Sequence, residues 1–164
     1  VVRSNYMEGM CNGVFGVNAA ITRGQIVTIL YRMEGEPGVD GLENAFTDVK
    51  EGKFYTEAVL WAASQGIVEG NGDGTFKPEA AITREQLAAI LYRYDGEQAV
   101  AEDVLSAFSD AGKVSNFAKE AMNWAVANGL INGIGNGASA TLSPTASASR
   151  AQFATILMRY MTEE

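Results

Sequence analysis

The stretch Ile82-Thr83-Arg84-Glu85-Gln86 decides the fold of this chain, because it occurs in three related forms. The other two copies are Ile21-Thr22-Arg23-Gly24-Gln25 and Ala148-Ser149-Arg150-Ala151-Gln152. The copies begin 61 and 66 residues apart, and a stretch that recurs at such a spacing indicates an internal repeat. Each copy is followed by apolar residues at helical spacing, so we expect three helices to begin at these points.

A capping box accounts for two residues of each copy. In the second copy, the hydroxyl of Thr83 can accept a hydrogen bond from a free backbone N–H at the helix start, and Gln86 can return the bond. Capping therefore explains Thr83 and Gln86 without a ligand. Because they lie at a helix start, both residues also remain candidates for ligand binding.

The arginine in each copy is not explained by capping. Arg23, Arg84 and Arg150 fall in the first helical turn, where the helix dipole favours anions and a cation is mildly unfavourable. An arginine beside a helix N-terminus can form an anion site, and its presence in three copies indicates a retained purpose. The alternative is that each arginine pairs with a nearby carboxylate. The sequence leaves both interpretations open.

The helices after the three copies, at about residues 22–34, 83–95 and 149–161, share one pattern. Four apolar residues at i, i+3, i+4 and i+7 place an apolar stripe on one face of each helix. These residues are Ile26, Ile29, Leu30 and Met33, then Leu87, Ile90, Leu91 and Tyr94, then Phe153, Ile156, Leu157 and Tyr160.

An earlier helix is predicted in the second and third repeats. Its apolar face follows the spacing i, i+4, i+7, i+8. The residues are Phe54, Ala58, Trp61 and Ala62, and in the third repeat Phe117, Ala121, Trp124 and Ala125. Gly66 and Gly129 follow at positions that suit a helix end. Trp61 and Trp124 could stack on sugar rings, but their helical phase equally suits core packing.

Each repeat therefore consists of a helix, a glycine-rich loop and a second helix. We place the repeats at 1–36, 45–96 and 107–164, within a single domain over 1–164. The first repeat lacks its beginning, since Val1 aligns with Ala58 in the middle of a helix. We expect a poorly supported helix over Val1–Glu8 and interpret the chain as a piece of a longer protein. One helix pair cannot bury both its faces, so the three repeats should pack together.

Two aspartates occupy equivalent places, in Phe46-Thr47-Asp48 and Phe108-Ser109-Asp110. Asp48 follows Arg23 by 25 residues and Asp110 follows Arg84 by 26, so the two pairs can adopt similar geometry. Each aspartate could cap the helix that follows, orient the arginine, or bind a ligand.

These motifs resemble the S-layer homology repeat. That family shows Phe-x-Asp, Trp-Ala in the first helix, Gly-Ile-x-x-Gly, Asp-Gly-Thr-Phe-x-Pro, and Thr-Arg-Ala-Glu before the second helix. The second repeat has Phe46-Thr47-Asp48, Trp61-Ala62, Gly66-Ile67-Val68-Glu69-Gly70, Asp73-Gly74-Thr75-Phe76-Lys77-Pro78 and Thr83-Arg84-Glu85-Gln86. The third repeat loses Asp-Gly-Thr-Phe, and all three copies carry glutamine where the family usually has glutamate.

The resemblance implies a mainly all-α domain in which three prongs radiate from a central three-helix bundle with pseudo-threefold symmetry. It also implies non-covalent anchoring of a surface protein to an anionic, often pyruvylated, cell-wall polysaccharide outside the cell. We expect arginine to bind a ligand carboxylate, with amides of the helix N-terminus and of the glycine loop at Gly70 as further donors. An aromatic ring or an aspartate would then hold the sugar hydroxyls. The alternative is a protein–protein or self-assembly module with degenerate sugar sites.

Composition excludes several other functions. The net charge of −8, with 12 basic and 20 acidic residues, argues against nucleic-acid binding. There is no histidine, so histidine-based catalysis and the usual metal sites are excluded, and we expect no enzyme activity, cofactor or metal. No run of residues predicts membrane insertion. Because the net charge of the chain is negative, an anionic polymer would have to be held by local cations.

Overall fold

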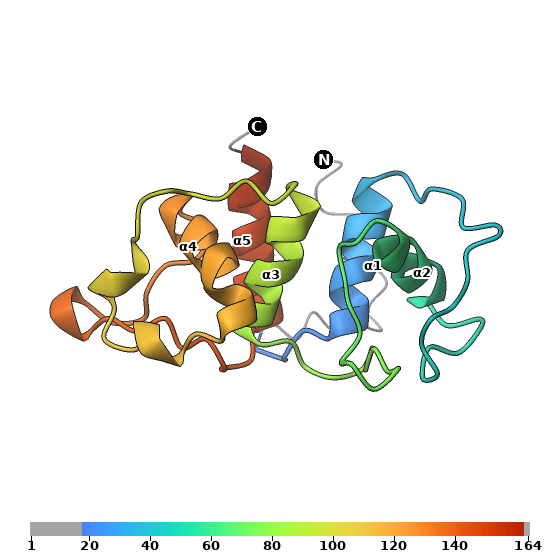
Figure 1. The fold of residues 1–164 in the computed structure, drawn as a ribbon, viewed down its shortest axis with the longest axis horizontal. Helices are drawn as coiled ribbons and strands as arrows, with labels where there is room; N and C mark the ends of the chain where they lie inside the picture. The colour runs from blue at the N-terminus through green and yellow to red at the C-terminus, as the bar shows by residue number, and fades with distance from the viewer. Residues whose placement is uncertain (1–17, 163–164) are drawn as a thin grey trace. The chain divides into compact units, whose positions relative to one another are not determined.

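The computed structural model describes residues 18–162, and this part of the chain is helical (Figure 1). Its α-helices are α1 (Arg23–Met33), α2 (Thr56–Ser64), α3 (Arg84–Tyr94), α4 (Lys119–Ala127) and α5 (Arg150–Thr162). Short 3₁₀ turns lie at η2 (Leu105–Ala107), η3 (Ala111–Lys113), η4 (Asn116–Ala118) and η5 (Gly137–Ser139). Within residues 18–162, β-type backbone pairing is limited to isolated bridges. The predicted all-α class is confirmed, while the expected helix over 1–8 lies outside the described residues.

The chain divides into two compact units, Val1–Ala81 and Ile82–Glu164. The division falls inside the expected second repeat, after its loop and before α3. Each unit thus joins the second helix of one repeat to the first helix of the next, α1 with α2 and α3 with α4. A common axis for α1, α3 and α5, and the single three-repeat domain, stay predictions.

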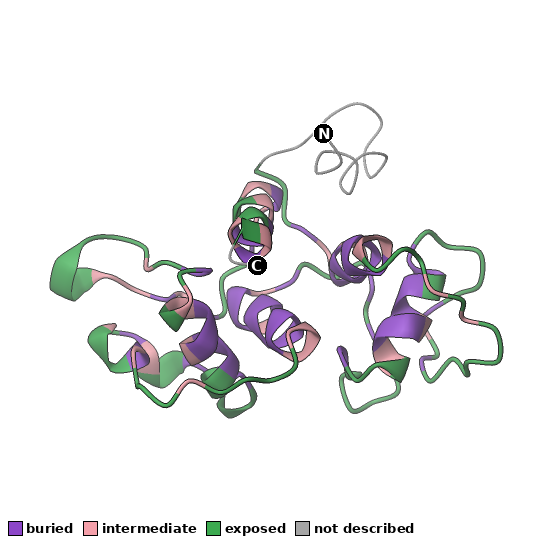
Figure 2. Ribbon diagram, turned by 90° about the horizontal axis from the view of Figure 1, so that it is seen from above, coloured by how far each residue is buried: buried purple, intermediate pink, exposed green. Residues whose placement is uncertain are grey.

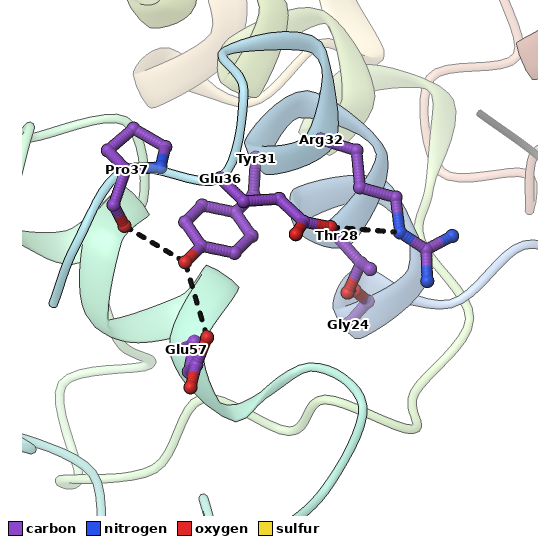
Figure 3. A network of polar contacts seen from close by, with 7 residues as sticks. All are labelled: Gly24, Thr28, Tyr31, Arg32, Glu36, Pro37 and Glu57. Atoms are coloured by element: carbon purple, nitrogen blue, oxygen red, sulfur yellow. Dashed lines mark hydrogen bonds and ion pairs between the residues drawn. The ribbon is translucent and has the colours of Figure 1, made fainter.

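In the first unit, α1 packs against α2 (Figure 1). The rings of Tyr31 and Trp61 lie 5.7 Å apart between the two helices. The Tyr31 hydroxyl donates to the carbonyl of Pro37 at 2.9 Å and to the carboxylate of Glu57 at 3.3 Å (Figure 3). One tyrosine therefore ties α1 both to the loop that follows it and to α2.

In the second unit, α3 packs against α4 in the same way, and the rings of Tyr92 and Trp124 lie 5.6 Å apart. Helix α5 meets the end of α3, where the rings of Tyr94 and Tyr160 are 6.0 Å apart. The Tyr160 hydroxyl also donates to Asp95 at 3.0 Å. The faces that the helices turn toward one another within each unit are buried (Figure 2).

The predicted helix boundaries are confirmed by their hydrogen bonds. Thr22 and Thr83 both form complete capping boxes with the glutamine three residues later, and Ser149 exchanges the same pair of bonds with Gln152. Gly66 and Gly129 end α2 and α4 with positive φ angles of 70° and 69°. This left-handed conformation at a helix end is the reason glycine is favoured there.

The prediction that Phe54 and Phe117 lie on buried helix faces is wrong. Each side chain is 58% exposed, and Tyr55 (3%) and Ala118 (0%) are buried in their place. The α-helices begin only at Thr56 and Lys119, after both phenylalanines. Helical periodicity therefore does not extend back to them.

Candidate functional site

The start of α3 is closed by backbone contacts from the third-repeat loop. The N–H of Arg84 donates to the carbonyl of Ala146, and the N–H of Glu85 donates to that of Pro144, both at 2.9 Å. The next N–H, of Gln86, donates to the Thr83 hydroxyl. The donors of a helix N-terminus that can bind anions are thus used inside the protein.

The start of α1 is closed in the same way, by Ala80 and Pro78 at 3.0 and 2.7 Å. The expectation that helix N-terminal amides donate to a ligand is therefore wrong for α1 and α3. Thr83 and Gln86 are likewise engaged in their capping box. The acceptors at each of these two helix starts come from the loop that precedes the capping stretch of the next repeat, which sequence reasoning could not place.

Asp48 and Asp110 accept hydrogen bonds from backbone N–H groups of the same loops. Asp110 accepts from the N–H groups of Leu142 and Ser143 at 2.7 and 2.8 Å. Asp48 accepts from Phe76 and Lys77, both at 2.8 Å. The capping alternative is wrong: α2 begins only at Thr56, and Asp110, although it precedes the 3₁₀ turn η3, makes no side-chain cap hydrogen bond to it.

The second residue in each contact has an unusual backbone. Lys77 and Ser143 have φ angles of 56° and 48°, and each precedes a proline. The left-handed region is unfavourable for residues other than glycine. The two aspartates therefore stabilise a strained turn that brings Pro78 and Pro144 to the helix starts.

The arginines bind the same loops through their side chains. Arg84 is 6% exposed, and its Nε donates to the carbonyl of Leu142 at 2.8 Å. Arg23 does the same to Phe76 at 2.8 Å, and its guanidinium lies 4.7 Å from the centre of that phenyl ring. In each unit, the arginine therefore binds the C=O and the aspartate binds the N–H of the same loop residue. This residue is Phe76 in the first unit and Leu142 in the second. These backbone contacts are a structural role of the arginine that neither sequence interpretation included.

The surroundings shift the pKa values of Arg84 and Asp110. Burial lowers the pKa of Arg84 because it disfavours the charged form, and the charge of Asp110 partly opposes this shift. Burial alone would raise the pKa of Asp110, but the backbone hydrogen bonds from Leu142 and Ser143 outweigh it and lower that pKa. The loop contact therefore favours the ionised carboxylate.

Asp110→Asn should lower the free energy of unfolding by about 1–3 kcal/mol at pH 7, because a backbone N–H loses its charged acceptor. The folded pKa lies below the unfolded value of about 3.9, so the stabilisation is present above that pH and is lost as pH falls through the folded pKa. Urea unfolding at pH 7 and in the acid range tests this, with Asp40→Asn in an exposed loop as control. A difference between wild type and variant that does not shrink in acid would contradict the prediction.

A pocket of about 340 Å³ lies in the second unit, beside Arg84. It is formed by the segment after α4 and by the exposed side of α5. Its lining residues are Arg84, Leu130, Ile131, Asn132, Ile134, Ala151, Gln152, Thr155, Ile156 and Arg159. The lining contains two arginines and no acidic residue, so the local charge is positive in a chain of net charge −8.

Asn132 connects the two arginines of this pocket. Its backbone carbonyl accepts from Arg84 Nη2 at 3.0 Å. With the side-chain amide assigned so that its oxygen faces Arg159, the orientation in which both polar groups are satisfied, that oxygen accepts from Arg159 Nη1 and Nη2, both at 3.1 Å. No ion pair to Arg84 or Arg159 is found within the described part of the chain. Both guanidinium groups are therefore held by neutral oxygens.

Sequence reasoning missed Arg159 and Asn132. A signal for Arg159 was present, since Arg32, Arg93 and Arg159 each follow the arginine of the capping stretch by nine residues. Asn132 carried no comparable signal, because the aligned residue of the second repeat is Glu69.

The remaining candidates do not line this pocket. Trp61 and Trp124 are 6% and 4% exposed and pack on tyrosines, as the core alternative expects. Gly70 is packed under Phe46, since an added Cβ would lie 2.7 Å from the Cε1 atom of that ring. Arg150 is buried at 3% exposure at the start of α5.

A larger pocket of about 520 Å³ lies between the 99–106 segment and α4. Its charged lining residues are Asp103, Lys119 and Glu120, so acidic groups outnumber the single cation. The smaller pocket is therefore better suited to an anion. Among the described residues, no cluster of three metal-ligating side chains occurs, and no helix has the length and apolar character needed to cross a membrane.

Comparison with known proteins finds a family model and several relatives that match this chain. The S-layer homology domain family matches residues 45–88 and 107–154, which is more than half of the chain. The Surface-layer 125 kDa protein of Lysinibacillus sphaericus is 33% identical over 162 residues, covering 97% of this chain and 13% of that protein. The Amylopullulanase of Thermoanaerobacterium thermosulfurigenes is 31% identical over 154 residues, covering 92% of this chain and 8% of that enzyme.

A shorter match is the Middle cell wall protein of Brevibacillus brevis, 32% identical over 90 residues that cover 53% of this chain and 8% of that protein. The chain thus spans only a small part of the length of each of these relatives. One relative is named as an enzyme and two as surface or wall proteins, so what they share with this chain is a segment found in proteins of different activity.

Proposed function

Because this chain belongs to the S-layer homology domain family, whose general role is non-catalytic anchoring at the cell surface, we propose that it binds an anionic cell-wall polysaccharide. The ligand group would be a carboxylate such as that of a pyruvate ketal. The parent protein would thereby be held non-covalently at the wall.

The observation that carries this proposal is the pocket with Arg84 and Arg159 and no acidic lining residue. Arginine presents five N–H donors, and the described contacts of Arg84 engage its Nε and one Nη2 hydrogen. Its remaining Nη hydrogens could bind a ligand carboxylate, with Arg159 as a second cation. Exposed Gln152 and Thr155 add polar groups for sugar hydroxyls.

The size of the pocket fits a small unit of a polymer. Ligand pockets commonly measure about 300–1,000 Å³, and 340 Å³ lies near the lower end of that range. One sugar ring with its substituent is a ligand of this scale. Binding at one such pocket would be weak to moderate, and repeated units on one polymer would raise retention through avidity.

Co-sedimentation with purified cell walls tests the proposal. We expect the chain to pellet with Lysinibacillus sphaericus sacculi, and to stay in solution when acid extraction has first removed the wall polymer. Equal pelleting with extracted sacculi would show that peptidoglycan or non-specific adsorption holds the chain, and the polysaccharide proposal would fail.

One observation favours the alternative of a protein–protein module. Phe54 and Phe117 occupy aligned positions and are both 58% exposed, and exposed aromatic groups are enriched where proteins meet. Self-association would appear in sedimentation velocity as a rise in molecular mass with concentration, in the absence of any polymer. Substitution of both residues by serine should abolish that rise.

A further inference from the structure

We infer that Asn132 determines the ligand specificity of the arginine pocket, by holding Arg159 in place while leaving the pocket lining with two arginines and no acidic residue. The inference rests on the proposed function and deepens it. It assigns the pocket to sugar units that carry an anionic substituent and excludes the same units in neutral form.

The contacts of Asn132 explain why a neutral residue matters here. Its two oxygens accept from both arginines, one through the backbone and one through the side chain. Leu130 adds a further backbone carbonyl, which accepts from Arg159 Nη1 at 3.4 Å. All these acceptors orient the guanidinium groups without cancelling their charge. An incoming carboxylate in this pocket would therefore form direct ion pairs with these two cations.

An acidic residue at this position would have the opposite effect. A carboxylate can accept the same two hydrogen bonds from Arg159 and would form an ion pair with it. The second repeat carries Glu69 at the aligned position, so the fold accommodates an acidic residue there. The choice of asparagine in the third repeat is therefore not forced by the backbone.

The substitution Asn132→Asp isolates the charge from the shape. Aspartate is nearly the same size as asparagine and keeps an oxygen toward Arg159. The net charge of the two arginines and residue 132 falls from +2 to +1. Asn136→Asp is the matched control, because Asn136 lies exposed in the same repeat outside the pocket lining and its substitution makes the same chemical change.

The ligand probe is a set of short fragments of the Lysinibacillus sphaericus wall polymer, since long chains would hide a change in one pocket through avidity. One sample is left untreated. In a second, the carboxylates are converted to neutral amides with carbodiimide and ammonia. Titration calorimetry is run at low ionic strength, where charge effects are least screened.

We expect Asn132→Asp to bind untreated fragments about tenfold more weakly than wild type, a size typical of a close charge pair. Asn136→Asp should bind like wild type. The amidated fragments should bind weakly to all three proteins and should not distinguish them. The melting temperature of Asn132→Asp should be equal to or above that of wild type, which excludes unfolding as the cause of the loss.

A second substitution tests whether the loss of binding comes from the charge of the pocket. Arg159→Gln removes one of the two charges and should give a similar loss, while Arg32→Gln at the equivalent place in α1 should not. If wild type binds the untreated fragments and Asn132→Asp binds them as tightly, the inference is overturned and the proposed function stands. If wild type binds neither fragments nor sacculi, the proposed function fails and this inference fails with it.

Discussion

Arg84→Ala is expected to weaken binding of wall-polymer fragments about 10- to 150-fold, as for the loss of one charge-assisted hydrogen bond of about 1.5–3 kcal/mol. It should also lower the free energy of unfolding by about 2–4 kcal/mol. The first effect follows from the place of Arg84 in the pocket lining. The second follows from the carbonyls of Leu142 and Asn132, which would lose a charged donor.

The stability effect departs from what the sequence predicts. A cation in the first helical turn is mildly unfavourable, so its removal alone would leave stability unchanged or slightly higher. The dipole effect is about 0.3–1 kcal/mol, which is smaller than the loss of two bonds to a buried guanidinium. We therefore expect the hydrogen bonds to decide the sign.

Arg84→Lys separates charge from geometry. Lysine keeps the positive charge, but its single ammonium cannot present a planar fork to two carbonyls and a ligand. We expect an intermediate loss of both stability and affinity. Calorimetric titration and urea unfolding on the same samples provide the measurement, with Arg32→Ala in α1 as control. If Arg84→Ala melts lower while its folded fraction binds as tightly as wild type, Arg84 has only a structural role.

Trp124→Ala should lower the free energy of unfolding by about 3–5 kcal/mol. Trp124 is 4% exposed and its ring lies 5.6 Å from that of Tyr92, so its removal leaves a cavity between α3 and α4. Domains are stable by only about 5–15 kcal/mol. The variant should therefore lose much of its tertiary structure on mild heating, which near-ultraviolet circular dichroism follows.

Phe117→Ala is the matched control for Trp124→Ala, because it removes an aromatic ring from the segment just before the same helix. Phe117 is 58% exposed, so its loss should change stability by no more than about 0.5 kcal/mol. The sugar-stacking interpretation makes the reverse prediction, with binding lost and stability kept in Trp124→Ala. A folded Trp124→Ala variant with wild-type melting and reduced wall binding would favour that interpretation.

The sequence by itself predicted the features that depend on a few neighbouring residues. The capping boxes at Thr22, Thr83 and Ser149 join residues three apart, and the glycines that end α2 and α4 act through their own backbone. The three related stretches indicated the family resemblance for the same reason, because each motif consists of consecutive residues. Local periodicity erred at Phe54 and Phe117, because it could not indicate that the helices begin after them.

The tertiary structure decided what the repeated arginine and aspartate do. Arg84 binds carbonyls 48 and 58 residues away, and Asp110 accepts from N–H groups 32 and 33 residues away. These contacts, and the closure of the helix starts by Pro78 and Pro144, depend on loops that return to a helix only after folding. Arg159 and Asn132 enter the pocket for the same reason, since separate segments bring them together. Sequence spacing specifies which residues share a helix face, whereas the partner of a buried charge is set by the packing of one element against another.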